Sequence, residues 1–209
     1  MGVLEQAIIF ATNRHEGMKR KSSNIPFIIH PLEAVSIAAG ITNDPEVLAA
    51  VVLHDVVEDT PTTLEEIESV FGKRIAMLVA SDNEDKMPDL PPSESWQIRK
   101  EMTIEHFETA SRDEKIILLS DKLSNIRSIN RDYSNKGESL WEIFNQKDKT
   151  KQEWYYREVA RVTSELSKES AYHEFCKHIV TIFQDETDTD KAADRLVRDI
   201  RITVDSANG

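Results

Sequence analysis

The sequence predicts an all-α protein, a helical bundle without a real sheet. Its 209 residues include only 6 glycines and 7 prolines, so few positions interrupt regular structure. Apolar residues recur at helical spacing through most segments, and no segment sustains the apolar–polar alternation that is typical of a half-buried strand. A chain of this length fits one domain, residues 1–209, with a sizeable core.

Local signals place the individual helices. Pro31 suits the first position of a helix, where its missing N–H has no cost, and Asp44 suits an N-cap. Capping boxes begin at Thr63 and at Ser111, each with a glutamate three residues later. The expected helices, with a loop at 81–93 and irregular residues at 132–148, cover 2–14, 31–40, 45–58, 64–79, 94–110, 112–130, 149–168, 171–184 and 189–205.

Composition excludes several classes of protein. The formal net charge of −12 predicts a soluble chain whose surface repels nucleic acid. No apolar run is long enough to cross a bilayer, residues 1–14 lack the pattern of a signal peptide, and one cysteine, Cys176, cannot form an intrachain disulfide. We therefore expect a cytoplasmic protein with a small-molecule partner rather than nucleic acid or a membrane; its oligomeric state stays open. A local gathering of cations suits a small polyanion: Arg14, Lys19, Arg20 and Lys21.

An apolar helix that ends in ionisable side chains is the most informative segment. Residues 49–53 are apolar and are followed by His54, Asp55, Glu58 and Asp59. His54 lies four residues before Glu58, and Asp55 lies four residues before Asp59. Residues at this spacing share a helix face. Buried charges need partners or a metal, and imidazole with carboxylate suits Mn²⁺, Zn²⁺ or Fe²⁺. The alternative is a helix end with surface acids and one hydrogen-bonded histidine.

Two further segments place polar side chains on apolar surfaces. His30 follows the apolar run 25–29 and precedes an expected helix, so its side chain points inward; a core histidine bonded to backbone is the alternative. Asp121 lies within an apolar helix, and Asn125 and Ser128 follow on the same face. The resulting set of two histidines and two aspartates, drawn from three helices, comprises His30, His54, Asp55 and Asp121.

This set resembles the metal signature of the histidine–aspartate (HD) superfamily. The finer likeness is to the hydrolase domain of Rel/Spo homologues, and it covers roughly residues 1–130. The matching segments are Arg20-Lys21-Ser22, Pro26-Phe27-Ile28-Ile29-His30-Pro31, His54-Asp55-Val56-Val57-Glu58-Asp59-Thr60, Phe71-Gly72 and Asp121-Lys122-Leu123-Ser124-Asn125-Ile126-Arg127. The resemblance implies an HD-domain helical bundle, with a more loosely related helical part over about 149–205.

The resemblance also implies an activity and a set of site residues. It implies a Mn²⁺-dependent enzyme that removes the 3′-diphosphate from guanosine tetra- or pentaphosphate alarmones, (p)ppGpp, and leaves GDP or GTP plus pyrophosphate. The implied metal ligands are His30, His54, Asp55 and Asp121. Glu58 and Asp59 match the catalytic acidic pair. The implied substrate contacts are Arg20, Lys21, Ser22, Asn125 and Ser128, the last standing where a threonine is usual.

Two regions depart from the family pattern. Residues 80–86 replace a stretch that resembles Gly-Val-Thr-Lys, and Lys86 is expected to substitute for the phosphate contact there. From about residue 132 the likeness is loose, and the chain ends where longer members begin a synthetase domain. It is therefore similar to the small stand-alone alarmone hydrolases, the metazoan SpoT homologues. Arg20 and Lys21 form the only dense positive pair expected near the site.

Other functions stay open. One is an HD phosphohydrolase for another nucleotide: an adenosine alarmone, a nucleoside monophosphate or a phosphorylated dinucleotide cofactor. Another is a metal-stabilised protein that binds a nucleotide or partner without turnover; the acidic pair argues against it, because a binding module needs none. The aromatic run Trp154-Tyr155-Tyr156 suits either a base pocket or the core.

Overall fold

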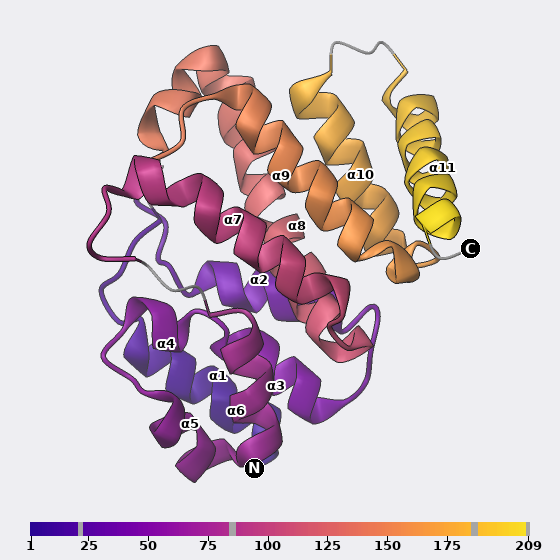
Figure 1. Ribbon diagram of the computed structural model, residues 1–209. Helices are drawn as coiled ribbons and strands as arrows, with labels where there is room; N and C mark the ends of the chain where they lie inside the picture. Colours follow the sequence, from indigo (N-terminus) through magenta and orange to yellow (C-terminus); the bar gives the residue numbers. More distant parts are fainter. Residues whose placement is uncertain (21–22, 84–86, 185–187, 208–209) are drawn as a thin grey trace.

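Helices form nearly all of the regular structure of this chain. The computed structural model describes residues 1–20, 23–83, 87–184 and 188–207. Within these ranges, extended pairing is limited to one isolated bridge between Lys19 and Pro26, so the all-α prediction is confirmed (Figure 1). The elements are α1 Val3–Arg14, α2 Ile29–Ala38, α3 Pro45–Leu53, α4 Val56–Asp59, α5 Leu64–Phe71, α6 Lys73–Ser81, α7 Pro92–Glu108, α8 Arg112–Lys136, η1 Gly137–Ile143, α9 Lys149–Val162, η2 Ser164–Leu166, α10 Ser170–Phe183 and α11 Thr189–Ala207.

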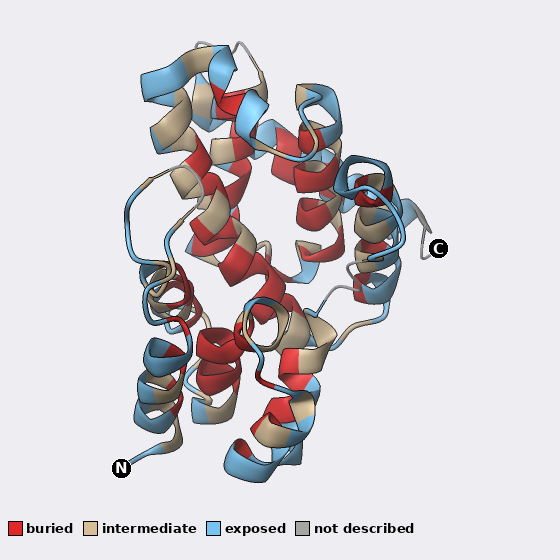
Figure 2. Cartoon of the chain, turned by 90° about the vertical axis from the view of Figure 1, so that its left-hand side faces the viewer, coloured by how far each residue is buried: buried red, intermediate tan, exposed pale blue. Residues whose placement is uncertain are grey.

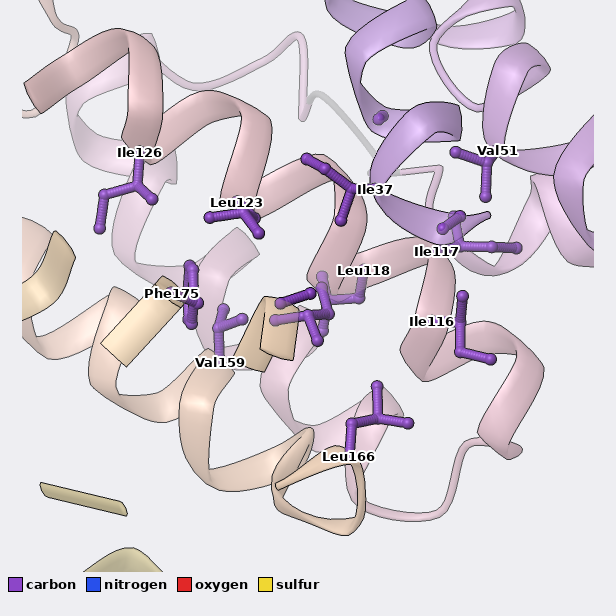
Figure 3. Close-up of a cluster of buried hydrophobic side chains, with 14 of the residues drawn as sticks. Ile37, Val51, Ile116, Ile117, Leu118, Leu123, Ile126, Val159, Leu166 and Phe175 are labelled. Atoms are coloured by element: carbon purple, nitrogen blue, oxygen red, sulfur yellow. The ribbon is translucent and has the colours of Figure 1, made fainter. Parts of the chain in front are cut away.

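The long helix α8 is shared by both halves of the molecule. It packs against α2, α3 and α6 from the N-terminal half and against η1, α9 and α10 from the C-terminal half. In Figure 1, helices α1 to α6 fill the lower part, α9 to α11 the upper part, and α7 crosses in front. Figure 3 shows side chains from both halves converging on α8, with Ile37 and Val51 from one half and Val159 and Phe175 from the other. The core is therefore continuous across α8.

The outer helices turn one face to the core and the other to solvent. Figure 2 shows buried residues along the inward faces of the helices and exposed residues along the outward faces. In α11, the buried residues recur at helical spacing and comprise Ala192, Ala193, Leu196, Val197 and Ile200. This helix packs mainly on α10, at the edge of the bundle (Figure 1). None of the helices in the described ranges is long and apolar enough to cross a membrane.

The capping signals predicted at Asp44 and Ser111 are confirmed. Asp44 accepts a hydrogen bond from the Glu46 N–H at 2.9 Å. At Ser111 the reciprocal capping box forms, with the side chain and backbone of Ser111 both paired to Glu114. The helix that starts there runs to Lys136, and residues 137–143 are a 3₁₀ helix. The prediction that all of 132–148 is irregular is therefore wrong in its first part.

The helix predicted over 45–58 is interrupted at the predicted site. α3 ends at Leu53 and α4 begins at Val56. His54 keeps helical dihedral angles, but Asp55 has φ −86° and ψ −7°, which opens the turn. The prediction of one continuous helix is wrong here, and Asp55 lies at the bend between α3 and α4.

Two other helix starts also differ from the prediction. The helix expected over 64–79 divides at Gly72, whose φ of 90° lies in the left-handed region that favours glycine. Thr63 still caps the first of the two helices, accepting from the Glu66 N–H. α2 begins at Ile29, so Pro31 lies within its first turn, where backbone N–H groups have no partner inside the helix.

Candidate active site

Four polar side chains meet at one point between α2, the α3–α4 bend and α8. The Nε2 atoms of His30 and His54 lie 3.2 Å apart. Asp55 Oδ2 lies 3.3 Å from the first of these nitrogens and 3.1 Å from the second. Asp121 Oδ1 lies 3.1 Å and 3.6 Å from the same two atoms. The structure thus brings together the four residues that the sequence pattern grouped.

The spacing of these atoms fits a divalent metal ion. Ligand atoms about 2.1 Å from one ion lie about 3.0 Å apart at adjacent octahedral positions and about 3.4 Å apart in a tetrahedron. The nitrogen–oxygen separations of 3.1 to 3.6 Å agree with this range. His30, His54 and Asp121 form a buried group whose ligand atoms all lie within 4.8 Å of one another, and Asp55 approaches both imidazoles from a partly exposed position.

Both imidazoles are anchored through their other ring nitrogen. His54 Nδ1 donates to the carbonyl oxygen of Val51 at 2.7 Å, because a carbonyl can only accept. His30 Nδ1 lies 2.8 Å from Ser124 Oγ, and that hydroxyl donates its single hydrogen to Glu33. The hydroxyl oxygen must therefore accept from His30. In the neutral form of each ring, Nε2 therefore keeps a lone pair that points into the cluster, as metal binding requires.

The electrostatics of the cluster favour added positive charge. Burial alone would lower the pKa of His54, but Asp55 and Asp121 raise it well above the usual range of a histidine. Burial alone would raise the pKa of Asp121, but Lys122 and the two histidines hold it well below its usual range. The pKa of Asp55 is lowered in the same way, against burial, by His54 and His30. A divalent cation supplies the positive charge that these carboxylates favour.

A cavity of about 470 Å³ borders the cluster. Asp55 and Asp121 contribute to its wall, and so do Glu58 and Asp59 of α4. The predicted catalytic pair therefore faces the same space as the predicted ligands. Glu58 is half-buried and Asp59 is exposed, whereas His54 lies behind the wall and is 2% exposed.

The predicted substrate contacts are connected to the cluster by hydrogen bonds. Arg20 Nη2 donates to Asn125 Oδ1 at 2.7 Å, and Asn125 Nδ2 donates to Asp121 Oδ1 at 2.6 Å. Arg20 also lies over the ring of Phe27, 5.7 Å from its centroid. Ser128 lines the same cavity. The remaining predicted contacts lie outside the described residues: Lys21, Ser22 and Lys86.

The cavity has cations that the sequence pattern did not indicate. Arg99 and Lys100 of α7 line it, and so does Lys122 of α8. The expectation that Arg20 and Lys21 are the only dense positive pair near the site is therefore wrong. α7 brings a second pair from a distant part of the chain, and two adjacent cations in an acidic sequence were the available signal.

Other sequence features fall into place around the cavity. Arg14 pairs with Glu66 and is not among the residues that line the cavity. Tyr156 is 5% exposed, which places it in the core, and it also lines the cavity. Asp82 is a cavity residue without a predicted role; burial raises its pKa to about 6, against the influence of Lys122.

The chain is similar to several known proteins. A zebrafish (Danio rerio) protein named guanosine-3′,5′-bis(diphosphate) 3′-pyrophosphohydrolase MESH1 is 39% identical over 132 residues, which cover 62% of this chain and 70% of that protein. The crystal structure of lmo0812 from Listeria monocytogenes EGD-e has a TM-score of 0.65 and 32% identity, and the match covers 75% of this chain and 94% of that one.

A solved structure of a metazoan ortholog of SpoT shares the fold over almost the whole chain. Its TM-score is 0.59 at 22% identity, and the match covers 95% of this chain and 96% of that one. The family described as HD domain matches residues 7–148, a segment that includes α2, the α3–α4 bend and α8. Since this match spans more than half of the chain and contains all four clustered residues, the chain belongs to the HD-domain family.

Proposed function

We propose that this chain is a metal-dependent pyrophosphohydrolase that removes the 3′-diphosphate from (p)ppGpp. The observation that carries the proposal is one cavity of about 470 Å³ whose wall includes His30, Asp55 and Asp121 of the cluster, together with the acidic pair and several cations. Such a wall suits a ligand with more than one phosphate group. The guanosine alarmone is the substrate in the name of the zebrafish relative, which is 39% identical to this chain.

The metal would be held by His30, His54, Asp55 and Asp121. Mn²⁺ is the ion we propose, because two imidazoles and two carboxylates suit a borderline-to-hard divalent ion, and Fe²⁺ and Zn²⁺ are the alternatives. When bound, such an ion polarises a phosphoryl oxygen and lowers the pKa of water.

The phosphates would be held by cations on the facing walls. Arg20 presents a planar guanidinium, which suits paired hydrogen bonds to phosphate or stacking on a purine. Lys122 of α8 and the α7 pair, Arg99 and Lys100, add charge at other points of the wall. Asn125 lies between Arg20 and Asp121, so it connects the phosphate side of the cavity with the cluster. We also propose substrate contacts for Ser128 and for the predicted residues Lys21, Ser22 and Lys86.

The reaction is the transfer of a diphosphate group to water. The oxygen of water forms a bond to the phosphorus that carries the 3′-oxygen, and the bond between that phosphorus and the 3′-oxygen breaks. Pyrophosphate leaves, and the ribose 3′-oxygen takes up a proton. Glu58 and Asp59 line the cavity and carry carboxylates suited to accept the proton from water. We expect the reaction to take place in the cytoplasm, in line with the charge balance and single cysteine of the sequence.

The test is a hydrolysis assay with purified protein and Mn²⁺ against a panel of nucleotides. The panel contains ppGpp, pppGpp, their adenosine counterparts, nucleoside monophosphates and a phosphorylated dinucleotide cofactor. The proposal predicts that ppGpp is consumed fastest, with GDP and pyrophosphate in equal amounts. Preference for another nucleotide, or release of single phosphate, would refute the substrate assignment. The Asp55→Ala variant is the blank for contaminating activity.

A further inference from the structure

A chain of hydrogen bonds leads away from the cluster to α10. It begins at His30, whose Nδ1 lies 2.8 Å from Ser124 Oγ. Ser124 Oγ donates to Glu33 Oε2 at 2.9 Å, and Arg127 Nη1 donates to Glu33 Oε1 at 3.2 Å. Arg127 also donates hydrogen bonds to both carboxylate oxygens of Glu174, from Nε at 2.7 Å and from Nη2 at 2.8 Å. The chain joins α2, α8 and α10.

Burial differs along this chain in an informative way. His30 and Ser124 are 4% and 1% exposed, so water does not compete for their hydrogen bonds. The side chains of Glu33, Arg127 and Glu174 are 29%, 30% and 40% exposed. Ion pairs this exposed contribute little to stability. These ion pairs therefore matter mainly through their effect on the buried hydrogen bond between His30 and Ser124.

The buried end has two possible hydrogen-bond directions. With Glu33 present, the Ser124 hydrogen is used by the carboxylate, so the hydroxyl oxygen accepts from His30 Nδ1–H. Without that acceptor, the hydroxyl is able to turn and donate to Nδ1. His30 would then carry its hydrogen on Nε2, the atom that lies 3.1 Å from Asp121, and would lose the lone pair needed for a metal.

We propose that Glu33 and Ser124 are positioning residues that keep His30 in its metal-binding tautomer. Glu174, acting through Arg127, holds Glu33 in place. Residue 174 lies beyond the HD-domain match, which ends at 148, so α10 contributes to the metal site without touching it. The inference rests on the proposed metal site, and direct metal binding to the unaltered chain tests that premise first.

The experiment measures Mn²⁺ affinity by calorimetry for the unaltered chain and for single variants. Ser124→Ala and Glu33→Ala should weaken Mn²⁺ binding by about 10- to 100-fold, the scale for groups that orient a ligand. Glu174→Ala should weaken it by roughly threefold to tenfold, because it acts one contact further out. Glu33→Gln keeps an acceptor oxygen for Ser124 and should stay within about threefold of the unaltered chain.

The matched control is Glu169→Ala. Glu169 precedes α10 and pairs with Arg112 of α8 at 2.8 Å, so it joins the same two helices by a similar ion pair. Glu169 is not part of the hydrogen-bond network that leads from His30 to Glu174, so its replacement should leave Mn²⁺ affinity unchanged. Melting temperatures without metal confirm that each variant is folded.

A second measurement reports the tautomer itself. Long-range ¹H–¹⁵N NMR correlations of the metal-free protein at alkaline pH should place the His30 hydrogen on Nδ1 in the unaltered chain and shift it toward Nε2 in Glu33→Ala. Equal Mn²⁺ affinity in all variants, or equal weakening by Glu169→Ala, would overturn the inference while leaving the metal site intact. If the unaltered chain binds no Mn²⁺, the proposed function fails with it.

Discussion

Two residues of the cluster, His54 and Asp55, and the acidic pair, Glu58 and Asp59, lie within six consecutive residues, yet the fold holds them in different ways. His54 is 2% exposed, follows the buried apolar residues 47–53 of α3 and is anchored to the backbone of that helix. Glu58 and Asp59 belong to a four-residue helix beyond the bend at Asp55. Glu58 is half-buried and Asp59 is exposed. The core thus fixes the residues that converge on one point, whereas the pair beyond the bend lies at the edge of the cavity.

This difference predicts which substitutions should abolish metal binding and which should affect only the reaction. Removing a clustered residue leaves buried polar partners without their counterpart, so metal binding and reaction should fail together. Removing a charge beyond the bend should leave the cluster intact.

Asp55→Ala should have the largest effect. It deletes one of the four converging ligands, and several kcal/mol of transition-state stabilisation should be lost with the metal, which is about a thousandfold or more in turnover. Metal content by elemental analysis and turnover are measured on the same sample. Full metal occupancy in this variant would contradict the assignment of the cluster.

Glu58→Gln and Asp59→Asn should separate the two regions. Both carboxylates line the cavity beside Asp55 and Asp121, which suits contact with a water or phosphate next to the ion. Turnover should fall by about a hundredfold or more, while metal content and substrate binding are retained. Near-normal turnover in both variants would show that the acidic pair has no catalytic role.

Replacing Arg20 and Lys21 together by Ala should weaken substrate binding by about tenfold or more, because charge-assisted hydrogen bonds to phosphate would be lost. The Michaelis constant should rise with metal content unchanged. Arg14→Ala is the control, since Arg14 pairs with Glu66 and does not line the cavity. An unchanged Michaelis constant in the double variant would assign the phosphates to the α7 pair instead.

Mn²⁺ should stabilise the protein more at about pH 8 than at about pH 6. The pKa of metal-free His54 is raised, so the stability that its protonation contributes is fully present below the unfolded value of about 6.5 and is lost as pH rises through the folded value. Protons also compete with the metal for this imidazole at the lower pH. The lowered pKa values of Asp55 and Asp121 place their titration below this window.

The Mn²⁺-induced rise in melting temperature should therefore be larger by roughly 3–6 °C at the higher pH. Thermal unfolding with and without the ion at both pH values provides the measurement. An equal rise at both values would mean that protons do not compete for the cluster.

Arg74→Ala should have the smallest effect. Arg74 pairs with Asp44, Glu46 and Asp113 on the surface, and its side chain is 44% exposed. Exposed pairs are worth about 0–1 kcal/mol, so urea unfolding should shift only slightly. Metal affinity should not change. A large loss of stability together with a loss of metal affinity would show that these surface ion pairs support the cluster.

Local signals were sufficient for much of the fold. Asp44 and Ser111 cap helices where the sequence predicted, because an N-cap hydrogen bond involves only the next few residues. The bend at Asp55 was missed, because the apolar run before it continues into Val56 and Val57 without a breaker. Packing of α3 against α8 joins segments far apart in the sequence, and such packing is not encoded in local periodicity.

The candidate site shows the same limit. The ligand set was predictable because each member is an unusual polar residue on an apolar surface, and the family resemblance grouped them. Arg99 and Lys100 were not, because only the packed position of α7 brings them to the cavity. The contact between Ser124 and Glu33 joins residues 91 positions apart, and nothing in either segment points to the other.

The position of α8 also determines how the molecule comes apart. Because one helix supplies Asp121 to the cluster and buried side chains to the cores of both halves, neither half can lose its structure while the other keeps a complete core (Figure 3). Amide hydrogens of α8 should therefore exchange with solvent only through global opening, whereas those of the edge helix α11 exchange through local fraying. The same helix α8 therefore contributes both to binding of the ion, through Asp121, and to cooperative unfolding of the two halves.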